Sequence, residues 1–128
     1  MADASGVAAI AARRRRERDE ALAVAKSYAE ALDADLPLVT AVVFGSYARG
    51  DFNIWSDVDV LILSDGLPGG YRERLDLLWR HRPGGLEPVG WTLSEHQERR
   101  QRRDPIAVEV DQVGMVVFGA VPAHLPTG

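Results

Sequence analysis

Two short apolar segments joined through a Gly-Ser turn constrain the fold of this chain more than any other feature. The first is LVTAVVF, residues 38–44, and the second is VDVLIL, residues 58–63. Both are rich in the β-branched and apolar residues that form buried strands. Gly45, Ser46 and Gly50 bracket a turn or short helix directly after the first segment. The pattern predicts a strand, a turn into a short helix, and a second strand.

Helical patterns flank these strands. An alanine-rich segment from about residue 8 to residue 32 repeats apolar side chains roughly every 3.6 residues, which predicts a long N-terminal helix. Further helices are expected over residues 71–81, 94–103 and 105–114, with strands at 86–91 and 115–118. Strands that alternate with helices around short turns indicate the α/β or α+β class, in which helices cover a central sheet.

The starts of two of these helices carry capping residues. Thr92 with Glu95 three positions later forms a capping-box pattern. Asp104 followed by Pro105 is typical of an N-cap with proline in the first turn. Both patterns predict a helix that begins within a residue or two of the cap.

The length of 128 residues favours one folding unit. Within it, we expect residues 1–36 to form an N-terminal helical extension and residues 37–119 to form the main domain. Residues 120–128 are expected to be a flexible tail.

The composition excludes several classes of site and partner. The chain has no cysteine, which rules out disulfides, Cys-ligated metal centres and a catalytic thiol. Its formal net charge is −4, whereas proteins that bind nucleic acid are usually basic, so we do not expect a nucleic-acid ligand. No apolar run is long enough to span a membrane and no apolar segment follows Met1, so we expect a cytoplasmic protein.

Two carboxylates at the start of the second strand are the main candidate functional residues. Because side chains alternate along a strand, Asp57 and Asp59 emerge on the same face. Paired carboxylates of this kind can chelate a hard cation such as Mg²⁺. Gly45 permits close approach of a ligand to the backbone, and the amides from Ser46 onward suit a phosphate. Together these residues predict a site for a metal-bound polyphosphate.

The residues GSYARGDFNIWSDVDVLIL, 45–63, resemble the DNA polymerase β-like nucleotidyltransferase superfamily. Within it they are most similar to the minimal nucleotidyltransferase branch, whose pattern is close to GSxARG, then SDxD and an apolar strand. The resemblance is strong over residues 39–63 and extends in general layout to residue 118. It implies a polymerase β-like fold with a mixed central sheet, and makes residues 37–119 the nucleotidyltransferase domain.

The resemblance also implies an activity. A nucleoside monophosphate, expected to be AMP, would pass from ATP or another NTP to an acceptor hydroxyl. Asp57 and Asp59 would bind two Mg²⁺ ions, and Glu87 would be the third carboxylate, holding the catalytic metal and helping to deprotonate the acceptor. Gly45 and Ser46 would contact the phosphates.

Two assignments remain open from the sequence. Glu87 is followed by proline and stands where related minimal proteins often have Asp, and Glu109 and Asp111, which we expect on a helix, are its rivals as third carboxylate. Arg49 either contacts the phosphates or pairs with Asp51 on the surface.

The acceptor is also open. Minimal proteins of this branch are commonly paired with helical HEPN-domain toxins, which they inactivate by transferring AMP to a tyrosine, so a HEPN-like protein partner and an antitoxin role are expected by analogy. The alternatives are a small hydroxylated acceptor, or a module that binds a nucleotide or partner without catalysis. The long N-terminal helix leaves a homo-oligomer possible.

Two arginine clusters have no assigned role. The run at residues 13–16 precedes Glu17, Asp19 and Glu20 at a spacing that suits ion pairs on an exposed helix face. The arginines within residues 99–103 either form a solvated face or contact a partner.

Overall fold

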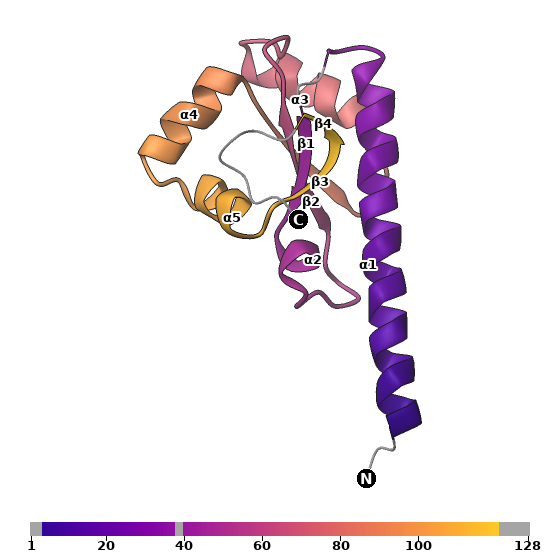
Figure 1. Ribbon diagram of the computed structural model, residues 1–128. Helices are drawn as coiled ribbons and strands as arrows, with labels where there is room; N and C mark the ends of the chain where they lie inside the picture. The colour runs from indigo at the N-terminus through magenta and orange to yellow at the C-terminus, as the bar shows by residue number, and fades with distance from the viewer. Residues whose placement is uncertain (1–3, 38–39, 121–128) are drawn as a thin grey trace.

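The centre of the molecule is a four-stranded mixed sheet. The computed structural model describes residues 4–37 and 40–120. The strands are β1 (Thr40–Phe44), β2 (Val58–Leu63), β3 (Leu86–Trp91) and β4 (Met115–Gly119), in the spatial order β3-β2-β1-β4. β1 pairs antiparallel with β2 and with β4, whereas β2 and β3 run parallel. The predicted α+β class, with a mixed sheet and a long N-terminal helix, is confirmed (Figure 1).

The described helices are α1 (Ala4–Asp33), α2 (Ser46–Arg49), α3 (Tyr71–Arg80), α4 (Leu93–Gln101) and α5 (Pro105–Val113). They match the expected segments to within a few residues, and α1 begins earlier than expected. The first two residues of the predicted first strand, 38–39, lie outside the described residues, as do residues 121–128 of the predicted tail. No helix in the described part of the chain has the length and apolar character needed to cross a membrane.

Helices cover both faces of the sheet, and each face has its own apolar core. On one face, α1 contributes a buried stripe, and the hydroxyl of Tyr28 donates a hydrogen bond of 2.6 Å to the carbonyl of Leu78 on α3. On the other face, Ala107 and Val110 of α5 pack against Leu61 and Trp91 of the sheet. Figure 1 shows α1 on one side of the sheet, with α4 and α5 on the opposite side.

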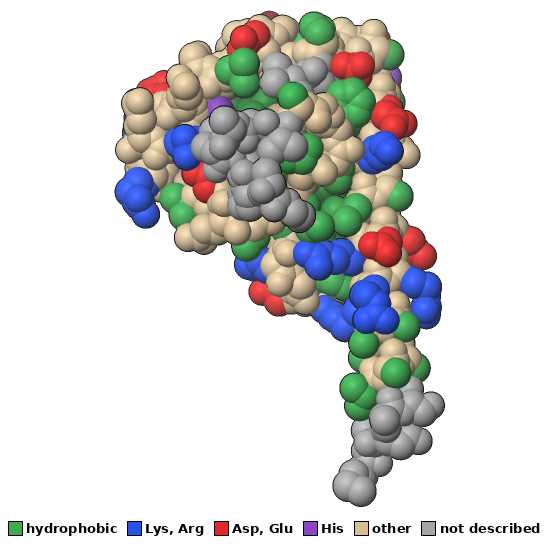
Figure 2. Space-filling view, viewed as in Figure 1, with side chains coloured by type: hydrophobic (Ala, Val, Ile, Leu, Met, Phe, Trp, Pro, Cys, Tyr) green, Lys and Arg blue, Asp and Glu red, His purple; other side chains and the backbone are tan. Residues whose placement is uncertain are grey.

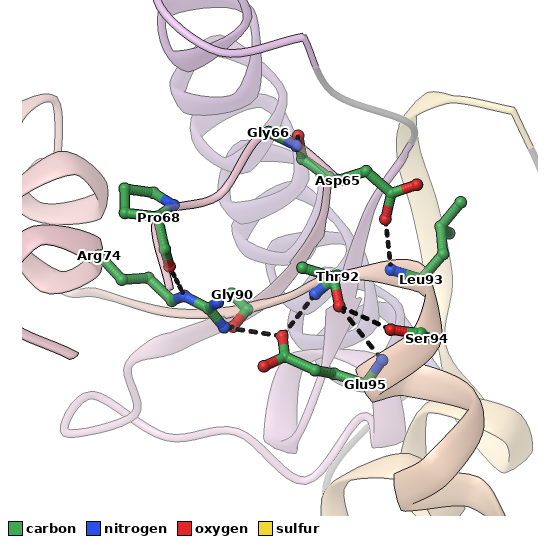
Figure 3. A network of polar contacts seen from close by, with 10 residues as sticks. Asp65, Gly66, Pro68, Arg74, Gly90, Thr92, Leu93, Ser94 and Glu95 are labelled. Carbon is green, nitrogen blue, oxygen red and sulfur yellow. Dashed lines mark hydrogen bonds and ion pairs between the residues drawn. The ribbon is translucent and has the colours of Figure 1, made fainter. Parts of the chain in front are cut away.

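The caps predicted for α4 and α5 are present. The Thr92 hydroxyl accepts a hydrogen bond from the Glu95 amide, and Oε1 of Glu95 accepts one from the Thr92 amide. Arg74 of α3 reaches the same carboxylate at 2.7 Å and also donates to the carbonyl of Gly90, so one network joins α3, β3 and α4 (Figure 3). Asp104 accepts from the Ile106 amide at the start of α5.

Only part of α1 packs against the sheet. Its buried side chains begin at Ala21 and continue to Leu32, whereas the turns before them extend past the body of the molecule (Figures 1 and 2). The division between a helical extension and a nucleotidyltransferase domain at residue 36 stays a prediction.

Candidate active site

The Gly-Ser turn folds the backbone directly against the Asp-x-Asp pair. Gly45 follows β1 and has φ of +76°, a conformation that costs non-glycine residues free energy. A Cβ atom at this position would clash with the carboxylate of Asp59. In the sheet, Phe44 lies opposite Asp59, which is why the turn after β1 meets this carboxylate. Glycine is therefore required at residue 45 for its backbone conformation and for the space that it leaves.

The parallel pairing of β2 and β3 brings a further carboxylate to the same place. Asp59 is in register with Glu87. Both residues alternate with Val58 and Leu86, which point into the core beneath α1, so the two carboxylates share the opposite face of the sheet. Asp57 lies directly before β2. The structure thus gathers all three predicted carboxylates at one end of two neighbouring strands.

Asp59 lies at the centre of a negatively charged cluster. Burial raises the pKa of Asp59 to about 6, and the negative charge of Asp57 adds to this shift. Glu109 and Glu87 act in the same direction, whereas Arg49 lowers the pKa. Like charges near a half-buried carboxylate disfavour its ionised form. A bound cation would relieve this repulsion.

From the sequence, Glu109 was only an alternative to Glu87 as the third carboxylate, and the structure places it beside the site. It lies on α5, as expected, and its carboxylate accepts a hydrogen bond from Arg49. Asp111, the other rival, pairs instead with Arg100 at 2.8 Å. No local sequence signal links Glu109 to the Gly-Ser turn, because 60 positions separate Arg49 from Glu109.

Arg49 and Glu87, the two residues whose roles the sequence left open, both form ion pairs within the chain. Arg49 contacts Asp51 at 3.2 Å as well as Glu109, so the surface pairing considered from the sequence is present. Glu87 pairs with Arg82 at 3.1 Å, and Nε of Arg82 donates to the carbonyl of Leu86 at 2.6 Å. Glu109 and Glu87 are thus each paired with an arginine. Contact of Arg49 with phosphate stays a prediction.

Two arginines of α1 support the turn from outside, a role that the sequence did not indicate. Arg14 donates to the carbonyls of Gly50 and Phe52 at 2.9 and 3.0 Å. Arg18 donates to the carbonyl of Ala48 at 2.8 Å. These carbonyls belong to the end of α2 and the loop after it, where backbone acceptors lack helical partners. The contacts fix α1 relative to the Gly-Ser turn.

The other cluster, within residues 99–103, is largely paired within the chain. Arg99 pairs with Asp104 at 3.0 Å, and Arg102 pairs with Glu98 at 2.6 Å. With the pair between Arg100 and Asp111, these contacts join α4 to α5 and the turn between them. Pairing of this kind favours a structural role for most of the cluster.

The carboxylate oxygens of the site fit a hard divalent cation, although they do not enclose one. Among the described residues, no three His, Cys, Asp or Glu side chains are arranged closely enough to enclose a metal ion. Asp57 and Asp59 nevertheless offer carboxylate oxygens, which are the ligands that Mg²⁺ prefers, and Mg²⁺ usually retains waters or takes substrate phosphates as its other ligands. An open pair of carboxylates is consistent with a metal that arrives with a polyphosphate.

The chain is similar to known proteins over most of its length. The family model for the nucleotidyltransferase domain matches residues 25–113. A crystal structure from Sulfolobus solfataricus, provisionally described as a nucleotidyltransferase, superimposes with a TM-score of 0.62 at 21% identity, covering 80% of this chain and 84% of that one. A structure described as a toxin-antitoxin with AMP-PNP gives a TM-score of 0.52 at 21% identity, covering 74% of this chain and 73% of the other. No curated protein sequence matches the chain.

Proposed function

The chain belongs to the nucleotidyltransferase domain family and is a nucleotidyltransferase enzyme, and we propose that it transfers AMP from ATP to a hydroxyl of a protein partner with the help of Mg²⁺. The observation that carries this proposal is the contact between the Gly45 turn and the Asp59 carboxylate. It brings a backbone suited to phosphate against a carboxylate suited to metal.

Each residue of the site has a proposed task. Asp57 and Asp59 would hold two Mg²⁺ ions, and Glu87 would complete the site for one of them and help to remove the proton of the acceptor hydroxyl. The ions would neutralise charge on the attacking and leaving oxygens of the displacement. Gly45 and Ser46 would contact the phosphates next to the leaving pyrophosphate. The protein itself contributes chiefly positioning and electrostatics.

Arg49 has two tasks in this proposal. Its exposed guanidinium, held by Asp51 and Glu109, lies at the end of α2 beside the carboxylate cluster. A triphosphate carries more negative charge than a single carboxylate and would compete for the same donors. We therefore expect Arg49 to contact the phosphates when the nucleotide is bound.

The proposed acceptor is a tyrosine of a helical HEPN-type toxin, which would give the enzyme an antitoxin role. Two comparisons support it. The resemblance of residues 45–63 is to minimal nucleotidyltransferases that are commonly paired with such toxins, and one structural neighbour is a toxin-antitoxin with AMP-PNP. A small hydroxylated acceptor is the alternative.

Transfer of label from [α-³²P]ATP tests the activity directly. The purified protein is incubated with Mg²⁺, labelled ATP and a lysate of its source organism, in parallel with the double variant Asp57→Asn/Asp59→Asn. We expect a labelled protein band with the wild type and none with the variant. [γ-³²P]ATP serves as a control, because nucleotidyl transfer leaves the γ-phosphate in pyrophosphate.

Each other outcome has a definite meaning. A labelled small molecule without a labelled protein would replace the protein acceptor with a small one. Equal labelling by the double variant would remove the assigned carboxylates from the mechanism. The melting temperature with added Mg²⁺ and ATP gives a second readout, since ligands that bind only the folded state stabilise it. We expect an increase for the wild type and none for the double variant.

A further inference from the structure

The first turns of α1 carry an apolar stripe that nothing in the described structure covers. Val7 is 56% exposed and Ile10 is 53% exposed. Ala21 and Val24 lie on the same line of the helix further along, and the positions between the two apolar pairs at this three- and four-residue spacing are Arg14 and Glu17. Short helical segments gain most of their stability from tertiary contacts. The projecting segment, residues 4–16, therefore has an apolar face suited to packing against another surface.

A groove that matches this stripe runs along the second half of the same helix. It has a volume of about 450 Å³ and lies between Ala21 and Val24 on one side and Tyr47, Ile54 and Ser56 on the other. Ile54 is 88% exposed although it is large and apolar. The groove thus presents apolar side chains from α1 and from the loop that leads to β2.

Charge distinguishes the projecting segment from the groove. Residues 4–16 contain Arg13 to Arg16 and no acidic residue. The groove is lined on its α1 side by Glu17 and Glu20. Figure 2 shows Lys and Arg side chains gathered where the projecting helix leaves the body of the molecule. The segment and the groove are therefore complementary in sign as well as in apolar character.

The intrachain contacts leave these groups available. Arg13 pairs with Glu17 at 3.7 Å, but the two side chains are 67% and 47% exposed. Exposed ion pairs of this kind contribute little to the free energy of folding. Arg14, in contrast, is held by the carbonyls of Gly50 and Phe52. This contact fixes the direction in which the projecting segment leaves the domain, so the segment is presented in one orientation.

We propose that a second copy of this chain supplies the occupant of the groove, with the projecting segment of each copy seated in the groove of the other. The two α1 helices then run antiparallel about a two-fold axis. Val7 lies opposite Val24 of the second copy, and Ile10 lies opposite Ala21. The same register brings Arg13 close to Glu20 of the second copy. A two-fold interface buries both stripes at once.

The register makes the proposal testable by a disulfide. The chain has no cysteine of its own, so the double variant Val7→Cys/Val24→Cys introduces the only thiols. Within one helix these positions are about 25 Å apart, far beyond the reach of a disulfide, which needs Cα atoms within roughly 7 Å. We expect mild oxidation to give a covalent dimer on a non-reducing gel. Neither single variant should crosslink, because in an antiparallel pair each cysteine lies far from the same cysteine of the second copy.

Sedimentation velocity from about 1 to 100 μM tests the interface without any substitution. We expect a dimer for the wild type and a monomer for Ile10→Asp, with Ala8→Asp, on another side of the same helix, as the matched control that stays dimeric. Glu20→Arg should weaken the dimer by at least tenfold, and Arg13→Glu/Glu20→Arg should restore it. A monomeric wild type at every concentration, or crosslinking by either single cysteine variant, would overturn the proposal. None of these measurements depends on nucleotidyl transfer.

Discussion

Arg49 at the end of α2 donates a hydrogen bond from Nη1 to Oε1 of Glu109 on α5, 60 positions further along the chain. This pair places a fourth carboxylate next to the cluster around Asp59. It also ties the helix that covers one face of the sheet to the turn that follows β1. The site is therefore assembled from segments that span the whole domain, and its electrostatics depend on residues outside the motif.

The stability of the protein without metal is expected to depend on Asp59. The pKa of this group is about 6 in the folded protein and 3.8 in its ordinary state. The folded state thus binds the proton more tightly than the unfolded state does. The resulting contribution to the free energy of unfolding is full below about pH 4 and is lost as the pH rises through about 6. In EDTA, Asp59→Asn should therefore be more stable than the wild type at pH 8, by about 1–3 kcal/mol, with a smaller difference at pH 5.

Urea unfolding at both pH values measures this difference. Asp76→Asn, at an exposed position of α3, is the control and should change the free energy of unfolding by less than about 0.5 kcal/mol. An Asp59→Asn variant less stable than the wild type at pH 8 would contradict the assignment of repulsion and burial at this carboxylate.

Glu109→Gln should shift the acid limb of the pH–rate profile to lower pH. Glu109 raises the pKa of Asp59, so its neutralisation lowers that pKa and leaves more of the ionised form available to bind metal in acid. The pH dependence of pyrophosphate release gives the measurement. Asp111→Asn on the same helix is the matched control. Because Asp111 pairs with Arg100, this substitution is expected to leave the acid limb in place. A limb that moves equally in both variants would assign the effect to α5 as a whole.

Three glycine-to-alanine variants separate the two reasons for glycine at residue 45, which are its positive φ and the space beside Asp59. Gly50 has φ of +94° with no atom near its missing Cβ, so Gly50→Ala should cost about 1–2 kcal/mol from backbone strain alone. Gly45→Ala adds the clash with Asp59 and should cost more and remove activity. Gly84→Ala, with open space and no positive φ, should be close to neutral. Chemical denaturation gives the order, and equal costs for the first two would exclude a role for the clash.

Tyr28→Phe should lower the free energy of unfolding by about 1–3 kcal/mol without changing the rate of nucleotidyl transfer. The buried hydroxyl donates to the carbonyl of Leu78, and its loss leaves a buried acceptor without that bond. Burial also raises the pKa of Tyr28, so no ionisation is expected near neutral pH. Tyr71→Phe serves as the control, since Tyr71 is 80% exposed. A loss of activity in Tyr28→Phe at full folding would link α1 to the site more directly than packing does.

The sequence by itself determined the local parts of this protein. The strands around the Gly-Ser turn, the place of Asp59 on β2 with Asp57 directly before the strand, and the caps at Thr92 and Asp104 all follow from residues within a few positions of one another. Backbone preferences, side-chain alternation and capping act over such short distances, so a pattern of residues is enough to predict them.

Only the tertiary structure decided which distant segments meet. The parallel pairing that sets Glu87 opposite Asp59, the approach of Glu109 to Arg49, and the place along α1 where packing stops depend on how the sheet and helices bury their apolar faces together. Several arrangements share the same local preferences, and the free energy of burial over the whole domain selects among them. For this reason Glu109 was only one of several candidates in the sequence, whereas in the fold it lies beside Arg49 and the carboxylate cluster around Asp59.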